Sequence, residues 1–135
     1  MLRTELDRAE EAELQSEEQL RQLVHAHHSN FAKQLVSVER LLHSGDETGL
    51  VRAGQIADAQ ALSHQMKGTA GSMGFPVVGQ AAAELDDILK GLKAEAVPVD
   101  ATRMQAAREQ LAKLQSIAAQ TTPEMSTLYH SDLSK

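Results

Sequence analysis

Apolar residues recur in steps of three and four along most of the chain, which is the spacing of helices with one buried face. Ser16 is a good N-cap for a first long helix. The positions on its predicted buried stripe are Leu20, Leu23, Val24, His27, Phe31, Leu35, Val38, Leu41 and Leu42. Ser44-Gly45-Asp46 ends this helix. The charged residues 1–16 predict either a further helix lying along a bundle or a partly ordered lead-in.

A second helix is predicted after a polar, Gly-containing connection at residues 44–55. It runs from about Ile56 to Met73. Gly74-Phe75-Pro76 closes it, because Gly suits the end of one helix and Pro the first position of the next. The third helix has the clearest apolar stripe of the sequence, formed by Val78, Ala81, Ala82, Leu85, Ile88, Leu89 and Leu92.

The fourth helix follows the break Val97-Pro98-Val99-Asp100, in which Asp100 is a candidate N-cap. Thr121-Thr122-Pro123 stops this helix, whose apolar positions are Met104, Ala107, Leu111, Leu114 and Ala118. We find no alternating pattern typical of a strand. We therefore predict an all-α fold, an antiparallel four-helix bundle over residues 17–120. The N-terminal helical segment 1–16 and a polar tail at 121–135 complete the domain division.

Composition narrows the function. Aromatic residues make up 2% of the chain, so Leu, Ala, Val, Ile and Met must fill the core. The net charge is −6 and the basic residues are scattered, which argues against a nucleic-acid partner. There is no Cys, no signal-peptide pattern at the start and no run long enough for a membrane span. We expect a cytoplasmic protein, and its starting Met and length favour a separate protein over a domain of a larger kinase.

The second helix carries the most informative pattern. At 100° per residue, one side of it collects Ala59, Leu62, Met66, Thr69 and Met73, which we predict to face the core. The opposite side collects Gln60, His64, Lys67, Gly68 and Gly71. His64 is therefore expected to project into solvent or toward a partner. Gln60, one turn earlier, either hydrogen-bonds the imidazole and fixes its tautomer or is an ordinary surface glutamine.

The two glycines beside His64 contradict helix propensity. A glycine inside a helix costs roughly 1 kcal/mol relative to Ala. Gly68 and Gly71 lie on the outer face, so core packing cannot explain them. Without side chains there, the imidazole stays accessible and the backbone of another protein can come close. Lys67, one turn along from His64, supplies a positive charge near any anionic group attached to the ring.

An exposed imidazole with a nearby cation has the features of a phosphoryl carrier. Its nitrogen is a competent nucleophile at neutral pH and can form a covalent intermediate. Phosphoryl transfer depends mainly on access, positioning and charge neutralisation. No carboxylate cluster is predicted on this face to hold Mg²⁺. The metal and the catalytic charge would therefore come from a partner.

The segment His64-Gln-Met-Lys67-Gly68-Thr-Ala-Gly71-Ser-Met-Gly74-Phe75 resembles the signature of the histidine-containing phosphotransfer (HPt) domain family. The resemblance extends from roughly Leu20 to Ala118, although only these dozen residues are specific. It implies a four-helix bundle, phosphorylation on Nε2 of His64 and exchange with the aspartate of a receiver domain. It also implies that Lys67 steadies the phosphoryl group and that Gly68 keeps the approach clear. The connection before the second helix is longer than is usual in this family.

The resemblance predicts a phosphoryl carrier in a two-component phosphorelay, without kinase activity or a cofactor of its own. Its partners would be receiver domains and a hybrid sensor histidine kinase, with Mg²⁺ on the receiver. The alternative is an adaptor whose open helix face binds a receiver or a kinase without transfer. A small-molecule enzyme is disfavoured, because no phosphate loop, acid/base pair or cofactor motif is found. His25 and His28 have helical i, i+3 spacing, but no third ligand completes a metal site.

Overall fold

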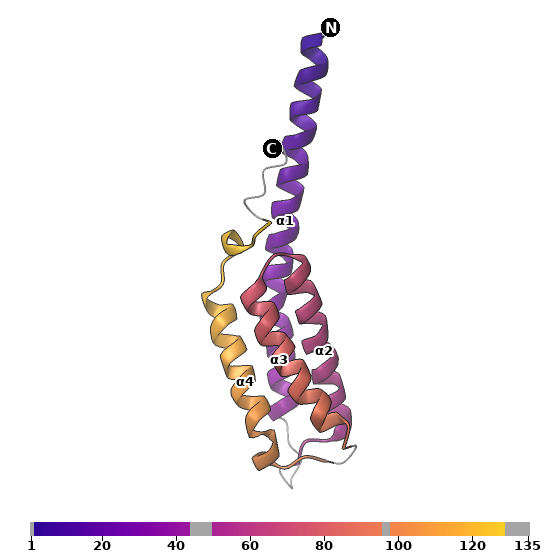
Figure 1. Cartoon of the computed structure of the whole chain (residues 1–135), viewed down its shortest axis with the longest axis vertical. Helices are drawn as coiled ribbons and strands as arrows, with labels where there is room; N and C mark the ends of the chain where they lie inside the picture. The colour runs from indigo at the N-terminus through magenta and orange to yellow at the C-terminus, as the bar shows by residue number, and fades with distance from the viewer. Residues whose placement is uncertain (1, 44–49, 96–97, 129–135) are drawn as a thin grey trace.

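The protein is an antiparallel bundle of four helices in the computed structural model, which describes residues 2–43, 50–95 and 98–128. The helices are α1 (Leu2–His43), α2 (Ala53–Ser72), α3 (Pro76–Lys93) and α4 (Ala101–Gln120), and the short 3-10 helix η1 (Pro123–Met125) follows. Figure 1 shows α1 and α3 running in one direction and α2 and α4 in the other. The predicted all-α four-helix architecture is confirmed.

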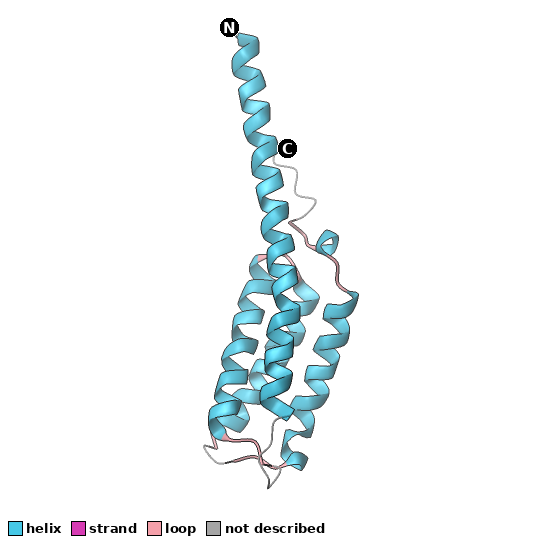
Figure 2. Ribbon diagram, turned by 180° about the vertical axis from the view of Figure 1, so that it is seen from behind, coloured by secondary structure: helices cyan, strands magenta, loops and turns pink. Residues whose placement is uncertain are grey.

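Helix α1 is longer than the sequence pattern predicted. It continues through Ser16, so the predicted helix start at that residue is wrong. Strong helix formers on both sides of Ser16 explain the continuity, because nothing there breaks the helix. The N-terminal part projects beyond the bundle instead of lying along it (Figures 1 and 2). Leu14 and Leu23 are exposed there, which corrects the predicted burial of Leu23, and full burial begins at Val24.

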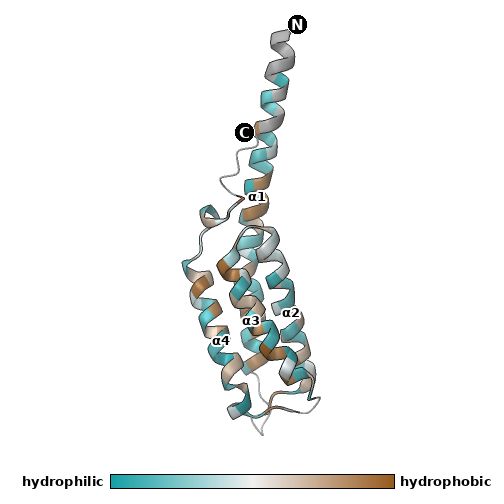
Figure 3. Ribbon diagram, in the orientation of Figure 1, coloured by the Kyte–Doolittle hydropathy of each residue, from teal (hydrophilic) through white to brown (hydrophobic). Residues whose placement is uncertain are grey.

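The core is built almost entirely from aliphatic side chains. Outside this core, the projecting part of α1 is mostly hydrophilic where Figure 3 colours it. The buried apolar residues of the four helices are Val24, Phe31, Leu35, Val38, Leu42, Ile56, Ala59, Met66, Ala70, Val78, Ala81, Ala82, Leu85, Leu89, Met104, Ala107, Leu111 and Leu114. Helix α2 packs most extensively against α3. No described helix is long and apolar enough to cross a membrane.

The buried face of α2 is rotated slightly from the predicted one. Its fully buried residues include Ser63 and Ala70, whereas Leu62, Thr69 and Met73 are only half-buried. Ser63 can be buried because its Oγ donates a hydrogen bond to the carbonyl oxygen of Ala59, 2.8 Å away. The opposite face still carries His64, as predicted.

The ends of the helices are fixed by local hydrogen bonds. Helix α2 begins at Ala53, three residues before the predicted start at Ile56. Asp100 caps α4 as predicted, because its side chain accepts a hydrogen bond from the backbone N–H of Arg103 at 2.9 Å. Val51 and Val99 form an isolated antiparallel pair with two backbone hydrogen bonds of 2.9 Å, which the sequence pattern did not predict. The predicted helix stop at 44–46 lies outside the described residues.

The first part of the C-terminal segment packs on the bundle and is not a loose tail. Ser126 is buried, and its Oγ donates to the carbonyl oxygen of Met73. The backbone N–H of Thr127 donates to the carbonyl oxygen of Gly74 at 2.9 Å. Gly74 has a φ of 78°, which favours glycine, and a Cβ there would also overlap Thr127. Residues 129–135 of the predicted tail lie outside the described part of the chain.

Candidate functional site

Helices α2 and α3 approach each other closely beside His64. A Cβ added at Gly79 of α3 would lie 3.6 Å from the Cβ of Ala70 and 3.8 Å from the carbonyl oxygen of Lys67. The small residues at this crossing therefore set the distance between the two helices. This packing places side chains of α3 within hydrogen-bonding reach of the histidine on α2.

His64 is exposed but held by a buried carboxylate. Its Nδ1 lies 3.0 Å from Oδ2 of Asp86 on α3. The His64 side chain is 62% exposed, whereas that of Asp86 is 0% exposed. A carboxylate is an acceptor, so Nδ1 carries the proton in this hydrogen bond. Nε2 is then the nitrogen with the free lone pair, and it lies on the other side of the ring from Asp86.

Three side chains converge on the Asp86 carboxylate. Besides His64, Gln60 donates from Nε2 to Oδ1 at 2.7 Å, and the Lys90 ammonium lies 3.5 Å from Oδ2. Burial raises the pKa of the Asp86 carboxyl, but the hydrogen bonds from Gln60 and His64 and the charge of Lys90 outweigh it, so the pKa lies below its usual value. Asp86 is therefore ionised near neutral pH and can stabilise positive charge on the imidazole.

The surface around His64 is open, as the sequence predicted. A Cβ added at Gly68 or at Gly71 would have no neighbouring atom within 4 Å. Both glycines and Lys67 are exposed. Within the described chain, the Lys67 ammonium has no hydrogen-bond or ion-pair partner of its own. A large, rigid partner can therefore approach the ring without meeting side chains at Gly68 and Gly71.

Asp86 is the site residue that sequence reasoning missed. The buried residues of α3 are Val78, Ala81, Ala82, Leu85, Asp86 and Leu89, so this carboxylate lies within the apolar stripe itself. The signal was an acidic residue among buried positions, one residue after Leu85. The sequence left Gln60 as either a partner of the imidazole or an ordinary surface glutamine, and the structure shows neither. Its amide contacts Asp86 instead, and its Oε1 accepts from Lys93 at 3.5 Å.

The other histidine cluster does not form a comparable site. In the described residues, no group of three or more His, Cys, Asp or Glu side chains could hold a metal ion. His28 Nε2 donates to the carbonyl oxygen of Thr121 at 2.6 Å, and its ring packs against Phe31 and Phe75. His27, predicted on the core stripe, is only half-buried.

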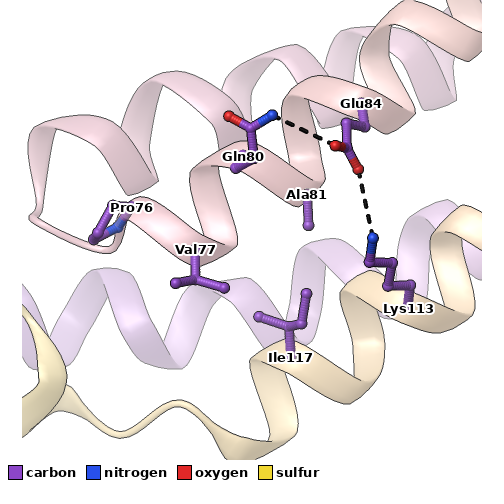
Figure 4. Close-up of a pocket in the computed structure, with 7 residues that line it drawn as sticks. All are labelled: Pro76, Val77, Gln80, Ala81, Glu84, Lys113 and Ile117. Carbon is purple, nitrogen blue, oxygen red and sulfur yellow. Dashed lines mark hydrogen bonds and ion pairs between the residues drawn. The ribbon is translucent and has the colours of Figure 1, made fainter.

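A groove of about 290 Å³ between α3 and α4 lies away from His64. Figure 4 shows its apolar lining, which includes Val77 and Ile117, and the contact between Glu84 and Lys113 at one end. The Lys113 ammonium is 3.9 Å from the Glu84 carboxylate. On α3, Glu84 and Asp86 are two residues apart and so point to opposite sides of the helix. The groove is therefore separate from the His64 site.

Comparison with known proteins identifies the family. The model of the Hpt domain family matches residues 14–117, which is more than half of the chain. No curated protein and no solved structure gives a significant match. The matched range includes His64, Asp86 and the two other side chains that contact Asp86, those of Gln60 and Lys90. The chain therefore belongs to the Hpt domain family, whose members carry phosphoryl groups in phosphorelays and interact with receiver domains.

Proposed function

We propose that this protein carries a phosphoryl group on Nε2 of His64 between two receiver domains of a two-component phosphorelay. The observation that carries the proposal is the hydrogen bond between Nδ1 of His64 and the buried Asp86. It commits one ring nitrogen and leaves the other free on an exposed face. Membership of the Hpt family supports the same role. The protein would act in the cytoplasm and receive its phosphoryl group through a hybrid sensor histidine kinase.

The geometry supports the following transfer step. The Nε2 lone pair attacks the phosphorus of an aspartyl phosphate on the donor receiver. The P–N bond forms, the P–O bond to the aspartate breaks, and the aspartate leaves as a carboxylate. The ring gains positive charge while Nδ1 keeps its proton. Asp86 stabilises that charge through the 3.0 Å hydrogen bond. The reverse step delivers the phosphoryl group to a second receiver.

The neighbouring residues have separate roles in this proposal. Lys67 binds the phosphoryl oxygens, since its ammonium is exposed one turn from His64. Gly68 and Gly71 leave room for the receiver. Gln60 supports the site by holding Asp86 in position. Mg²⁺ is contributed by the receiver domain, and this chain uses no cofactor of its own.

The test is phosphoryl transfer from a panel of phosphorylated receiver domains to the wild type, His64→Gln and His28→Gln. We expect acid-labile, alkali-stable phosphate on the wild type and on His28→Gln, and none on His64→Gln. Circular dichroism would check that each variant is folded. Label on folded His64→Gln would refute the proposal. If receivers bind the wild type tightly but transfer nothing, the protein is an adaptor instead.

A further inference from the structure

The Asp86 carboxylate creates an electrostatic conflict once His64 is phosphorylated. A phosphoryl group carries about 1.5 to 2 negative charges near neutral pH. It would be attached to a ring that already contacts a buried, ionised carboxylate. Lys67 supplies one positive charge on α2. The positive charge of the phosphorylated ring offsets that of Asp86, but a single exposed lysine does not balance the charge of the phosphoryl group itself.

Lys90 is the cation best placed to resolve this conflict. Its ammonium lies 3.5 Å from Oδ2 of Asp86, and this is the oxygen that accepts the hydrogen bond from His64. The Lys90 side chain is 51% exposed, whereas the carboxylate is fully buried. The lysine can therefore move while Asp86 stays in place. A lysine is a compact charge on a flexible stem of four carbons, which allows such a movement.

Lys93 differs from Lys90 although both lie on α3. Its ammonium contacts Oε1 of Gln60 at 3.5 Å and is not in contact with Asp86. This contact fixes the orientation of the amide, with the oxygen toward Lys93 and the nitrogen toward Asp86. The two lysines have similar chemistry and neighbouring positions, but only Lys90 shares an acceptor atom with His64.

We infer that Lys90 is a second phosphoryl-binding cation, which moves from Asp86 toward the phosphoryl group when His64 is phosphorylated. This inference rests on the proposed function of His64. Before transfer, Lys90 helps to keep Asp86 ionised. After transfer, it pairs with phosphoryl oxygens together with Lys67, and the imidazole keeps the Asp86 carboxylate as its partner. The phosphoryl group is thus bound by one lysine from α2 and one from α3.

The experiment uses phosphoramidate, a small-molecule donor, so that no receiver has to be identified. Nε2 of His64 would attack its phosphorus, the P–N bond of the donor would break, and ammonia would leave. The rate of labelling and the lifetime of phosphohistidine are measured for the wild type, Lys90→Gln, Lys90→Arg and Lys93→Gln. We expect Lys90→Gln to slow labelling about threefold to tenfold, which is the effect of one partly exposed charge. Lys90→Arg should restore most of the rate, and Lys93→Gln should change it less than twofold.

A second measurement separates the effect of Lys90 on Asp86 from its effect on the phosphoryl group. Carbon-13 NMR of the unphosphorylated protein follows the titration of the Asp86 carboxyl. Lys90→Gln should raise the pKa of Asp86, because a neighbouring positive charge is removed. Normal labelling of Lys90→Gln, even with a raised Asp86 pKa, would overturn the inference and leave Lys90 as a structural ion-pair partner. Labelling of a residue other than His64 would instead overturn the proposed function together with the inference.

Discussion

His64 and His28 are both held by one hydrogen bond, yet they use opposite ring nitrogens. His64 donates from Nδ1 to the Asp86 carboxylate, and its ring is exposed. His28 donates from Nε2 to the carbonyl oxygen of Thr121. The centroid of its ring lies 5.9 Å from that of Phe75, on the inner side of α1. In the proposed function, the committed nitrogen and the surroundings of the ring distinguish the reactive histidine from the structural one.

The largest expected effect comes from removing Asp86, the hydrogen-bond partner of His64. Asp86→Ala should slow phosphoryl transfer by about tenfold to a hundredfold, the range found for partners that orient metal-ligating histidines. Asp86→Asn keeps an acceptor but loses the charge, and should fall between Asp86→Ala and the wild type. Stopped-flow or quenched transfer assays with a phosphorylated receiver measure these rates. Transfer within twofold of the wild type in Asp86→Ala would show that His64 does not depend on this contact.

The second prediction concerns the structural histidine. His28→Ala removes a hydrogen bond and two aromatic contacts, and should lower the free energy of unfolding by about 2 kcal/mol. The transfer rate of the folded variant should be unchanged. His43→Ala, at the exposed end of α1, is the matched control and should change stability by less than about 0.5 kcal/mol. Urea unfolding followed by circular dichroism measures both. A loss of transfer in folded His28→Ala would show that His28 is not purely structural.

The third prediction separates stability from access to His64. Gly68→Ala meets no atom within 4 Å and should stabilise the helix by up to about 1 kcal/mol. It should nevertheless slow transfer from a receiver, because the added methyl group lies on the approach to His64. Gly91→Ala in α3 also meets no atom within 4 Å, and should stabilise the protein without slowing transfer. Equal transfer rates for the two variants would show that Gly68 does not lie in the interface.

The smallest expected effect is on the pH dependence of folding. The pKa of the Asp86 carboxyl is lower in the folded protein than its usual value, because its hydrogen bonds and the charge of Lys90 outweigh the effect of burial. Its contribution to stability is therefore complete above the usual pKa and is lost as the pH falls through the lowered one. Urea unfolding between about pH 6 and 2 should show a shallower acid loss for Asp86→Asn than for the wild type. Identical slopes would contradict this account.

The sequence predicted the helices and the histidine better than it predicted the site around the ring. Helical spacing identified the stripes, and the unexplained glycines singled out the face of His64. Asp86 was missed because its contact with His64 depends on how α2 and α3 cross, and helix spacing carries no information on that crossing. Gly79 permits the close approach of the two helices, but its neighbours across the interface are known only from the fold.

The other differences have similar causes. Ser16 is a good N-cap in isolation, but strong helix formers before it let α1 continue. The Val51–Val99 pair joins two loops that are far apart in the sequence. Local patterns cannot predict such a pair. Ser63 is buried because its hydroxyl bonds to its own helix, which hydrophobic spacing does not show.

In the part of the chain that the structure describes, the side chains that hold His64 come from two consecutive helices joined by a short turn. Asp86 is only 22 residues from the histidine, and Gln60 and Lys90 lie within the same α2–α3 hairpin. The side-chain contacts of the proposed reactive centre therefore lie within α2 and α3, and none of them involves a side chain of α1 or α4. Substitutions on the exposed faces of α1 and α4 leave these contacts unchanged. Helices α1 and α4 can therefore vary in sequence while the environment of His64 is kept.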